Sequence, residues 1–334
     1  MINPLKYFTN RKVGLVLGSG GAKGISHIAV IEYIEAHDIP IHFIAGSSIG
    51  AVVGALYSSG KLKEYKDFLL DLEWSEMIKY FDPVFPKSGL IEGQKIIEML
   101  EKFIPRDYLI EDLPIPLSIV ATDYYTGMPV VFRSGRVLDA IRASISIPGV
   151  FIPMRYKDTF LVDGGVANPL PIDIVKDMGA GKVIAVNLHP IIHSGSKKLR
   201  NMVESKIKTV EGDSSQLEMI SEKNNMKGQN IKKSGTDKNW LNSVQKWLGI
   251  DVDEKSEKVK MPNIFEVMYQ TVDIMEYTNT LFMIRYNPPA VLIEPNLEDM
   301  PTLDFTRSSK ILAEGYSACS RNQKALDRKI KWWV

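Results

Sequence analysis

The stretch Ile41-His-Phe-Ile-Ala-Gly46-Ser-Ser48-Ile-Gly50-Ala-Val-Val-Gly54 predicts the organisation of the whole chain. Residues 41–45 are an apolar run typical of a buried strand, and the small apolar residues at the other end are typical of a packed helix. Between them, the pattern G-x-S-x-G predicts a sharp strand-to-helix turn with Ser48 at its tip. We expect a side chain at Gly46 or Gly50 to collide with the neighbouring strand or helix. Ser48 is therefore a candidate nucleophile, and the alternative is a turn that serves only tight packing.

A glycine-rich loop lies one strand-and-helix unit earlier. Residues 12–17 have the composition of a buried strand, and residues 25–36 that of a helix. The backbone N–H groups of a loop in this position converge on an anion. A nucleotide phosphate is disfavoured because the loop has neither G-x-G-x-x-G spacing nor a Ser or Thr after Lys23. With a serine turn in the next unit, an oxyanion hole is the better interpretation. The loop residues expected to form it are Gly20, Gly21, Ala22, Lys23 and Gly24.

A carboxylate follows another short apolar strand, in the segment Thr159-Phe-Leu-Val-Asp163-Gly164-Gly165. Open α/β sheets place their sites at the carboxyl ends of strands, which makes Asp163 a candidate site residue. Gly164 and Gly165 would let the backbone turn sharply behind the carboxylate without shielding it. An Asp-Gly hairpin is the alternative. Prolines 169 and 171 disfavour it, because they make a following strand implausible.

A serine hydroxyl needs a base to remove its proton. Histidine is the usual base, and the chain order Ser, acid, His of an α/β hydrolase would nominate His189 or His193. Neither lies in a glycine-rich context, and His27, His37 and His42 lie near the first two motifs rather than after the acid. Asp163 acting directly on Ser48 is the better-placed candidate. A solvated Asp is a weak base, so this interpretation predicts partial burial of the carboxyl in a dry, apolar cleft that raises its pKa.

The composition of the chain limits the classes of protein to which it could belong. The 334 residues are 45% hydrophobic and carry 41 Lys and Arg against 40 Asp and Glu, so net charge gives no support for nucleic-acid binding. The single cysteine, Cys319, excludes an internal disulfide and fits a reducing compartment. The first ten residues lack a signal-peptide core. No run reaches the roughly 18 apolar residues of a membrane span. We expect a cytoplasmic protein whose membrane contact, if any, is peripheral at the inner face, and we see no metal-ligand cluster.

Residues 193–262 are rich in Lys, Ser, Asn and Glu and interrupt the buried pattern. A polar insertion this long is usually mobile or functional, for instance as a lid. Within it, Trp240 and Trp247 share one predicted helical face beside basic residues. That face would suit a lipid interface, or it would cover the core if folded inward. Trp332 and Trp333, near the C-terminus, also lie beside basic residues and are a second candidate lipid interface. A dimer contact is the alternative there.

Buried patterns return after the insertion. They predict a helix over residues 263–286, a strand over residues 290–294 and a closing helix over residues 308–329. Before the insertion, residues 117–122 and 130–132 predict a hairpin with Thr126-Gly127 near its turn. We therefore expect both flanks to complete one domain, 1–334, with a motif-bearing core over residues 12–190.

The three motifs, Gly18–Gly24, Gly46–Gly50 and Asp163–Gly165, resemble in this order those of the patatin-like phospholipase family. Ala143-Ser-Ile-Ser-Ile-Pro-Gly-Val-Phe-Ile-Pro153 is similar to the segment that precedes the family's aspartate. The resemblance covers roughly residues 12–190. It implies a three-layer α/β/α fold with a mostly parallel sheet, a Ser48–Asp163 dyad, an oxyanion hole from the glycine loop, and hydrolysis of lipid acyl esters without metal or cofactor. Lys23 stands where the family often has arginine, which keeps the charge but loses the bidentate fork.

The sequence thus predicts a lipid-degrading serine acyl hydrolase of phospholipase, lysophospholipase or esterase type. Ser48 would attack the ester carbonyl, Asp163 would accept the proton, and the loop amides would hold the oxyanion. Two alternatives stay open: a catalytically idle, membrane-associated lipid-binding scaffold, and an acyltransferase that uses the same serine. The physiological lipid, its chain length and a homodimeric state are not specified by the sequence.

Overall fold

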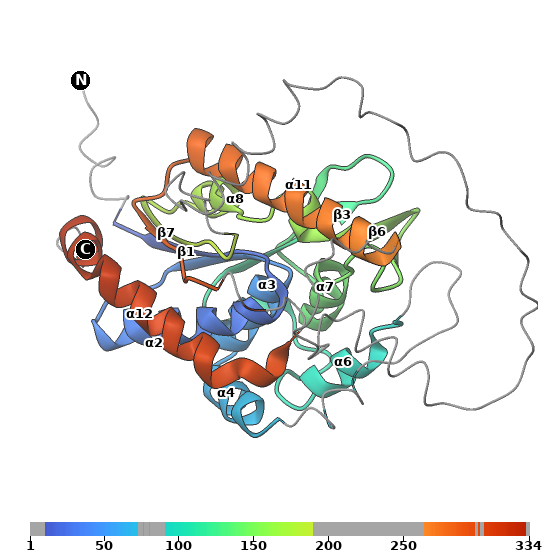
Figure 1. Ribbon diagram of the computed structural model, residues 1–334, viewed down its shortest axis with the longest axis horizontal. Helices are drawn as coiled ribbons and strands as arrows, with labels where there is room; N and C mark the ends of the chain where they lie inside the picture. The colour runs from blue at the N-terminus through green and yellow to red at the C-terminus, as the bar shows by residue number, and fades with distance from the viewer. Residues whose placement is uncertain are drawn as a thin grey trace, which may run out of the picture. The chain divides into compact units, whose positions relative to one another are not determined.

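The computed structural model describes residues 11–72, 76, 80, 91–189, 264–297, 300 and 304–331. Eight strands form one sheet in the order β5-β6-β3-β2-β1-β7-β8, with β4 also paired to β3 (Figure 1). The strands are β1 (Val13–Leu17), β2 (Phe43–Ser47), β3 (Leu117–Asp123), β4 (Pro129–Phe132), β5 (Met154–Tyr156), β6 (Thr159–Asp163), β7 (Lys182–Val186) and β8 (Val291–Ile293).

The sheet is mixed, with its parallel part at one end. β3, β2, β1, β7 and β8 pair in parallel with one another, whereas β4 and β6 pair antiparallel with β3, and β5 pairs antiparallel with β6. Parallel strands need crossover connections, and the helices between them supply these. The predicted hairpin is present as β3 and β4, paired from Ile119 with Phe132 to Thr122 with Pro129.

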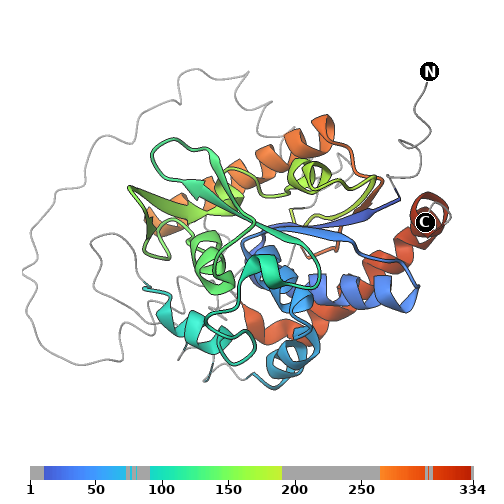
Figure 2. The same cartoon turned by 180° about the vertical axis from the view of Figure 1, so that it is seen from behind.

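Helices cover both faces of the sheet. They are α2 (Ser26–Ala36), α3 (Ile49–Ser58), α4 (Leu62–Asp71), α6 (Gln94–Leu100), α7 (Val137–Ser144), α8 (Ile172–Asp177), α11 (Ile264–Tyr286) and α12 (Ser308–Leu326). Short helical turns are η1 (Gly21–Ile25), η3 (Ile110–Asp112), η4 (Gly164–Val166), η5 (Phe305–Arg307) and η6 (Asp327–Lys331). α8 and α11 lie on one side, and α2, α3, α4 and α12 lie on the other (Figures 1 and 2). The three-layer α/β/α fold implied by the sequence is confirmed.

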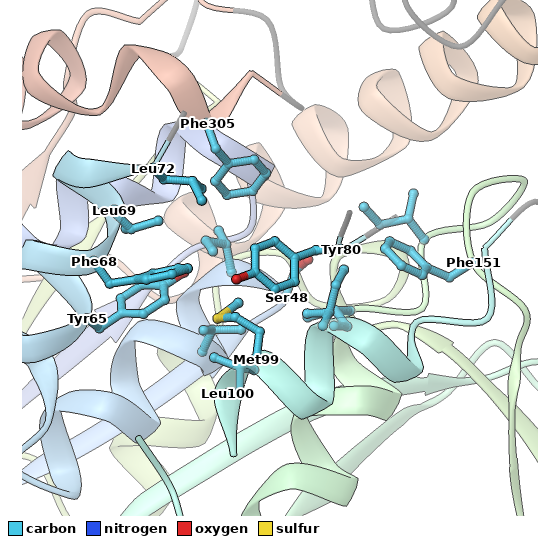
Figure 3. A pocket seen from close by; sticks show the side chains of 16 residues that line it. Ser48, Tyr65, Phe68, Leu69, Leu72, Tyr80, Met99, Leu100, Phe151 and Phe305 are labelled. Atoms are coloured by element: carbon cyan, nitrogen blue, oxygen red, sulfur yellow. The ribbon is translucent and has the colours of Figure 1, made fainter. Parts of the chain in front are cut away.

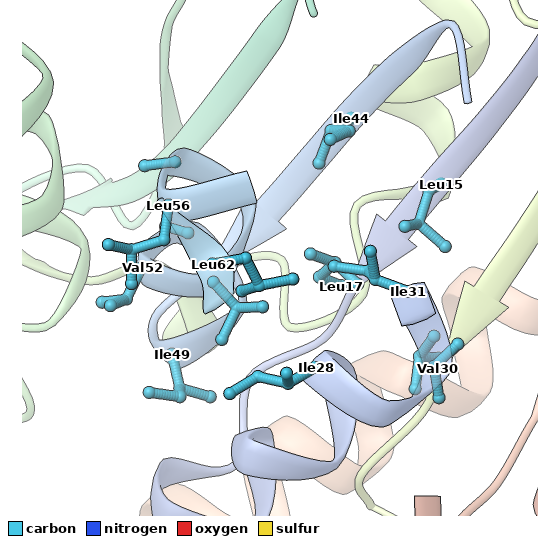
Figure 4. Packing of buried hydrophobic residues seen from close by; sticks show 14 of the residues in the cluster. Leu15, Leu17, Ile28, Val30, Ile31, Ile44, Ile49, Val52, Leu56 and Leu62 are labelled. Carbon is cyan, nitrogen blue, oxygen red and sulfur yellow. The ribbon is translucent and has the colours of Figure 1, made fainter. Parts of the chain in front are cut away.

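Alternation along β1 divides the core between the two faces. Leu15 and Leu17 pack with the side chains of α2 and α3, including Ile28 and Val52, in the larger cluster (Figure 4). Val16 points the other way, into a smaller cluster with α8. Because each parallel strand is buried on both faces, its sequence is a continuous apolar run rather than an alternating one. That is why the runs before both glycine motifs could be recognised as strands.

Element boundaries differ from the predictions by a few residues. The elbow strand begins at Phe43 rather than Ile41 and continues through Ser47, because Gly46 and Ser47 pair with β3. The strand expected over residues 290–294 is β8, which spans only Val291–Ile293. The helix expected over residues 263–286 is confirmed as α11. Residues 193–262 lie outside the described part of the chain, and no helix within the described part is long and apolar enough to cross a membrane.

Candidate active site

Ser48 lies at the turn between β2 and α3, where the central sheet ends. Its φ of 54° and ψ of −122° are unusual for a residue with a side chain. Such a conformation costs about 1–3 kcal/mol and persists only where the surroundings impose it. Gly46 and Gly50 are part of those surroundings. A Cβ at Gly46 would lie 2.5 Å from the carbonyl oxygen of Gly50, and a Cβ at Gly50 would lie 2.0 Å from the carbonyl oxygen of Leu17. Both glycines therefore permit the close approach expected from the sequence.

A buried hydroxyl that the sequence did not single out holds this turn. The Ser48 amide donates to Ser144 Oγ at 2.8 Å, and Ser144 Oγ donates to the carbonyl oxygen of Val120 at 2.6 Å. Ser144 is the last residue of α7 and has no exposed surface. Ser144, 96 residues away in the sequence, thus connects the strained serine to β3. No local pattern marks this role, because serine is common at helix ends.

We expect Ser144→Ala to destabilise the protein by about 1–3 kcal/mol, because the Ser48 amide would lose its partner inside the protein. Ester hydrolysis should fall about tenfold or more, since a serine displaced by a fraction of an ångström attacks its substrate less well. Chemical denaturation and kcat/KM measure the two effects. Ser58→Ala is the matched control, because the buried Ser58 hydroxyl has no hydrogen-bond partner in the described structure. Equal, small effects of both substitutions would contradict this role for Ser144.

Asp163 lies beside Ser48. Ser48 Oγ donates to Asp163 Oδ2 at 2.6 Å, and the Gly165 amide donates to Asp163 Oδ1 at 2.7 Å. The backbone of Asp163 is held on both sides, because its N–H donates to the carbonyl oxygen of Ser146 and its C=O accepts from Thr122 Oγ1. The carboxylate is therefore fixed in position before any substrate binds.

Asp163 is the last residue of β6, so its predicted place at the carboxyl end of a strand is confirmed. The sequence pattern did not specify the direction of this strand, and β6 is antiparallel to β3. β6 enters from beyond the end of β3 and stops where Asp163 pairs with Ala121, one residue along from the pairing of Ser47 with Val120. Gly164 has no left-handed backbone conformation; instead, a Cβ there would lie 2.1 Å from the carbonyl oxygen of Val120. The chain does turn here, in η4, but the glycines after Asp163 are needed for close packing rather than for a left-handed backbone conformation.

Burial sets the protonation behaviour of Asp163. The residue is 1% exposed. Burial, together with the negative charge of Glu276, raises the pKa of Asp163 to about 8, although the hydrogen bonds from Ser48 and Gly165 and the charge of His189 oppose the increase. A carboxylate with a pKa in this range is a far stronger base than a solvated one.

His189, the alternative base considered from the sequence, has other partners. Its Nε2 lies 2.8 Å from Glu276 Oε2 and 3.3 Å from Ser19 Oγ, and its Nδ1 lies 3.5 Å from Asp273 Oδ1. Burial lowers the pKa of His189, but the hydrogen bonds and charges of Asp273 and Glu276 outweigh it and raise the value to about 9. His189 is therefore an imidazolium at neutral pH, which cannot accept a proton.

The other described histidines have structural roles. His27 Nε2 lies 2.8 Å from the carbonyl oxygen of Gly18, and complete burial lowers its pKa to about 4, so it is neutral. His37 Nδ1 lies 2.8 Å from the Tyr33 carbonyl oxygen at the end of α2. His42 Nδ1 accepts from the Val13 amide at the start of β1. His193 lies outside the described residues.

The glycine loop adjoins Ser48 along part of its length. Gly20 and Gly21 line a cavity with Ser48, whereas Ala22 is buried. Gly24 is a packing position, because a Cβ there would lie 2.3 Å from a side-chain carbon of Ile49. Lys23 is partly buried, and its charge helps to lower the pKa of Asp273. The oxyanion hole stays a prediction, with Gly20 and Gly21 as the loop residues that lie nearest the nucleophile's cavity.

Two cavities with different linings meet at Ser48. The larger, about 800 Å³ including its open mouth, is almost entirely apolar (Figure 3). Its walls include aromatic and aliphatic side chains of α4, α6 and the segment after α7: Tyr65, Phe68, Leu69, Met99, Leu100, Ile145 and Phe151. The smaller, about 340 Å³, is lined by Asp163, His189, Tyr269, Asp273 and Glu276. Gly21, Ser48 and Ile147 border both. The apolar cleft expected beside the dyad is thus present on one side only.

Some predicted site residues cannot be placed. Trp240, Trp247, Trp332 and Trp333, proposed as a lipid interface, lie outside the described residues, and membrane contact stays a prediction. Within the described part of the chain, no three His, Cys, Asp or Glu side chains are grouped so as to hold a metal ion. Cys319 is buried in α12, as expected of a packing residue.

Comparisons of the whole chain show similarity to several known proteins. Residues 15–176 match the model of the patatin-like phospholipase family. An uncharacterized NTE family protein of Mycobacterium tuberculosis is 29% identical over 333 residues, which cover 95% of this chain and 92% of that protein. Patatin-like phospholipase domain-containing protein 6 of Mus musculus is 28% identical over 322 residues, or 93% of this chain and 20% of the relative. Lysophospholipase NTE1 of Debaryomyces hansenii is 27% identical over 318 residues, 93% of this chain and 18% of that protein.

Proposed function

Because residues 15–176 form a patatin-like phospholipase domain, we propose that this chain is a lipid acyl hydrolase that cleaves carboxylic esters with a Ser48–Asp163 dyad. The observation that carries the proposal is the 2.6 Å hydrogen bond from Ser48 Oγ to Asp163 Oδ2. The bond joins the only two residue types that the reaction requires, a nucleophile and a base, at the meeting point of two cavities. The names of the relatives, phospholipase and lysophospholipase, favour lipid esters as substrates.

In the acylation step, Asp163 Oδ2 accepts the Ser48 hydroxyl proton while Ser48 Oγ bonds to the ester carbonyl carbon. The carbonyl oxygen becomes an oxyanion, and backbone amides at Gly20 and Gly21 are the candidates to stabilise it. When the tetrahedral intermediate collapses, the ester C–O bond breaks and Asp163 returns its proton to the leaving alcohol. The products of this half-reaction are the acyl-Ser48 ester and a free alcohol.

In the deacylation step, Asp163 is again ionised and accepts a proton from water. The resulting hydroxide attacks the acyl carbonyl, and Ser48 leaves with the proton that Asp163 carries. A free carboxylic acid departs, and the dyad is restored. Since Asp163 must be ionised at the start of each step, kcat/KM should rise with pH until the pH passes the pKa of Asp163.

The two cavities fit the two halves of a lipid ester. The apolar cavity would take the acyl chain, since burying each methylene is worth about 0.8 kcal/mol. The polar cavity would take the alcohol, which leaves with the proton from Asp163. A substrate with one long chain and one compact polar group, as in a lysophospholipid, satisfies both.

The experiment that tests this function uses p-nitrophenyl esters of graded chain length and a fluorophosphonate probe. We expect the probe to label Ser48, as located by mass spectrometry of the modified peptide, and we expect activity to increase from short to medium or long acyl chains. Probe labelling without turnover would favour the acyltransferase alternative, which added alcohol acceptors would reveal. Absence of labelling and of turnover would contradict the proposal and favour a lipid-binding scaffold.

A substitution in the apolar cavity tests the placement of the acyl chain. Met99→Trp adds bulk to the wall of this cavity, so we expect the preferred chain to shorten while the shortest esters are cleaved at nearly the original rate. Met128→Trp is the control, because Met128 is exposed in the turn between β3 and β4. An unchanged chain-length profile in Met99→Trp would place the acyl chain elsewhere.

A further inference from the structure

The dyad mechanism leaves a buried group of charges beside Asp163 unexplained. Glu276 on α11 contacts His189, which follows β7, with Oε2 and Nε2 2.8 Å apart. Ser19 Oγ donates to the same Glu276 oxygen at 2.8 Å. The Glu276 and His189 side chains are 12% and 8% exposed. Charged side chains this well buried are uncommon unless they are paired with good geometry. This group joins three separate parts of the chain, which contribute Ser19, His189 and Glu276.

Gly165 brings the Glu276 carboxylate next to Asp163. A Cβ at Gly165 would lie 2.3 Å from Glu276 Oε1 and 3.0 Å from Asp163 Oδ1. The two carboxylates therefore converge on the one place where a side chain is missing. Two carboxylates that share a site disfavour each other's ionisation, so the charge on Glu276 makes Asp163 hold a proton more tightly.

His189 opposes this effect. Its positive charge neutralises Glu276 and attracts the ionised form of Asp163, which lowers the Asp163 pKa. Among the described residues, the other titratable groups that line the cavity are Asp273 and Tyr269 on α11, and the charge of Lys23 on η1 acts on Asp273. Asp273 lies 3.5 Å from His189 Nδ1 and helps to keep the imidazole protonated.

We propose that Glu276 and His189 are positioning residues that set the strength of Asp163 as a base. The Glu276 carboxylate strengthens this base, and the His189 imidazolium weakens it. The proposal rests on the proposed function, in which Asp163 is the base. It explains why a glycine follows Asp163 at position 165, where the Glu276 carboxylate needs the space. It also gives α11 a part in the chemistry, although α11 lies about a hundred residues after Asp163 in the chain.

The test compares pH profiles of kcat/KM, whose acidic limb reports the ionisation of Asp163. In the wild type we expect a midpoint near pH 8. Glu276→Gln removes the repelling charge and should move the midpoint down by about one pH unit, whereas His189→Asn should move it up by a similar amount. Glu276→Asp keeps the charge and should leave the midpoint near that of the wild type. Glu64→Gln is the control, because Glu64 pairs with Lys61 on the surface.

Opposite shifts in the two variants would support the proposal, and a merely structural role would lower activity without moving the midpoint. Midpoints that stay fixed while activity still depends on Asp163 would overturn the inference alone. Absence of any Asp163-dependent activity would overturn the proposed function and the inference together. Imidazole NMR gives a measurement without turnover: the His189 ring should remain protonated at pH 7.5 in the wild type and titrate at lower pH in Glu276→Gln. A neutral His189 at pH 7.5 would also overturn the inference.

Discussion

Asp163→Asn is expected to reduce kcat/KM for ester hydrolysis by about a thousandfold or more, because a positioned general base contributes about 10²–10⁴ in rate. The carboxamide has nearly the same shape as the carboxylate. Its oxygen can still accept from the Gly165 amide, so the loop after β6 should keep its conformation. The group facing Ser48 Oγ would then be an NH2, which cannot accept the hydroxyl proton. The loss therefore falls on chemistry rather than on structure.

Thermal denaturation should show a melting temperature equal to or above that of the wild type. Because burial raises the Asp163 pKa to about 8, folding at neutral pH must protonate this carboxyl, which costs stability, and a carboxamide does not carry that cost. Ser48→Ala is the companion variant and should lose as much activity. If Asp163→Asn stayed active while His189→Asn were inactive, His189 would be the base. The interpretation of His189 as an imidazolium paired with Glu276 would then be wrong.

Three local patterns were sufficient to predict that Ser48 and Asp163 lie together. G-x-S-x-G after an apolar run, a glycine loop one unit earlier and Asp-Gly-Gly after a short strand each describe a backbone shape that few residues allow. The hydrogen bond between Ser48 and Asp163 in the structure joins two of these patterns across 115 residues. Such motifs can be recognised in a sequence because glycine is needed wherever two backbone segments lie too close together for a Cβ atom to fit between them.

The residues around the dyad were not predictable in the same way. Ser144, Asp273 and Glu276 act through contacts with parts of the chain far away in sequence, and each occupies a helix position where its type is ordinary. The helical period of α11 does place Asp273 and Glu276 on one face, since they are three residues apart. This spacing would have predicted a polar stripe along the helix, but it would not have predicted that the stripe contacts His189. The antiparallel course of β6 was missed for the same reason, because strand direction depends on pairing partners.

Gly50→Ala is expected to destabilise the protein by about 3 kcal/mol or more and to remove most of its activity. A methyl group at position 50 would lie 2.0 Å from the carbonyl oxygen of Leu17 and 2.9 Å from that of Gly18, and both belong to backbone. β1 cannot move away, because it is paired with β2 on one side and β7 on the other. The first turn of α3 would have to shift instead, and Ser48 directly precedes it.

Gly54→Ala separates this collision from the general effect of adding a methyl group to α3. At Gly54 the nearest atoms are side-chain carbons of Ile44 and Leu117, 3.1 and 3.2 Å away, which can yield by small rotations. Alanine also favours a helix over glycine by about 1 kcal/mol, so this variant should be close to the wild type in stability and activity. Chemical denaturation and kcat/KM of the two variants make the comparison. Similar values for both would mean that the approach of α3 to β1 at Gly50 is not what holds Ser48 in its strained conformation, and the role assigned to the elbow glycines would be wrong.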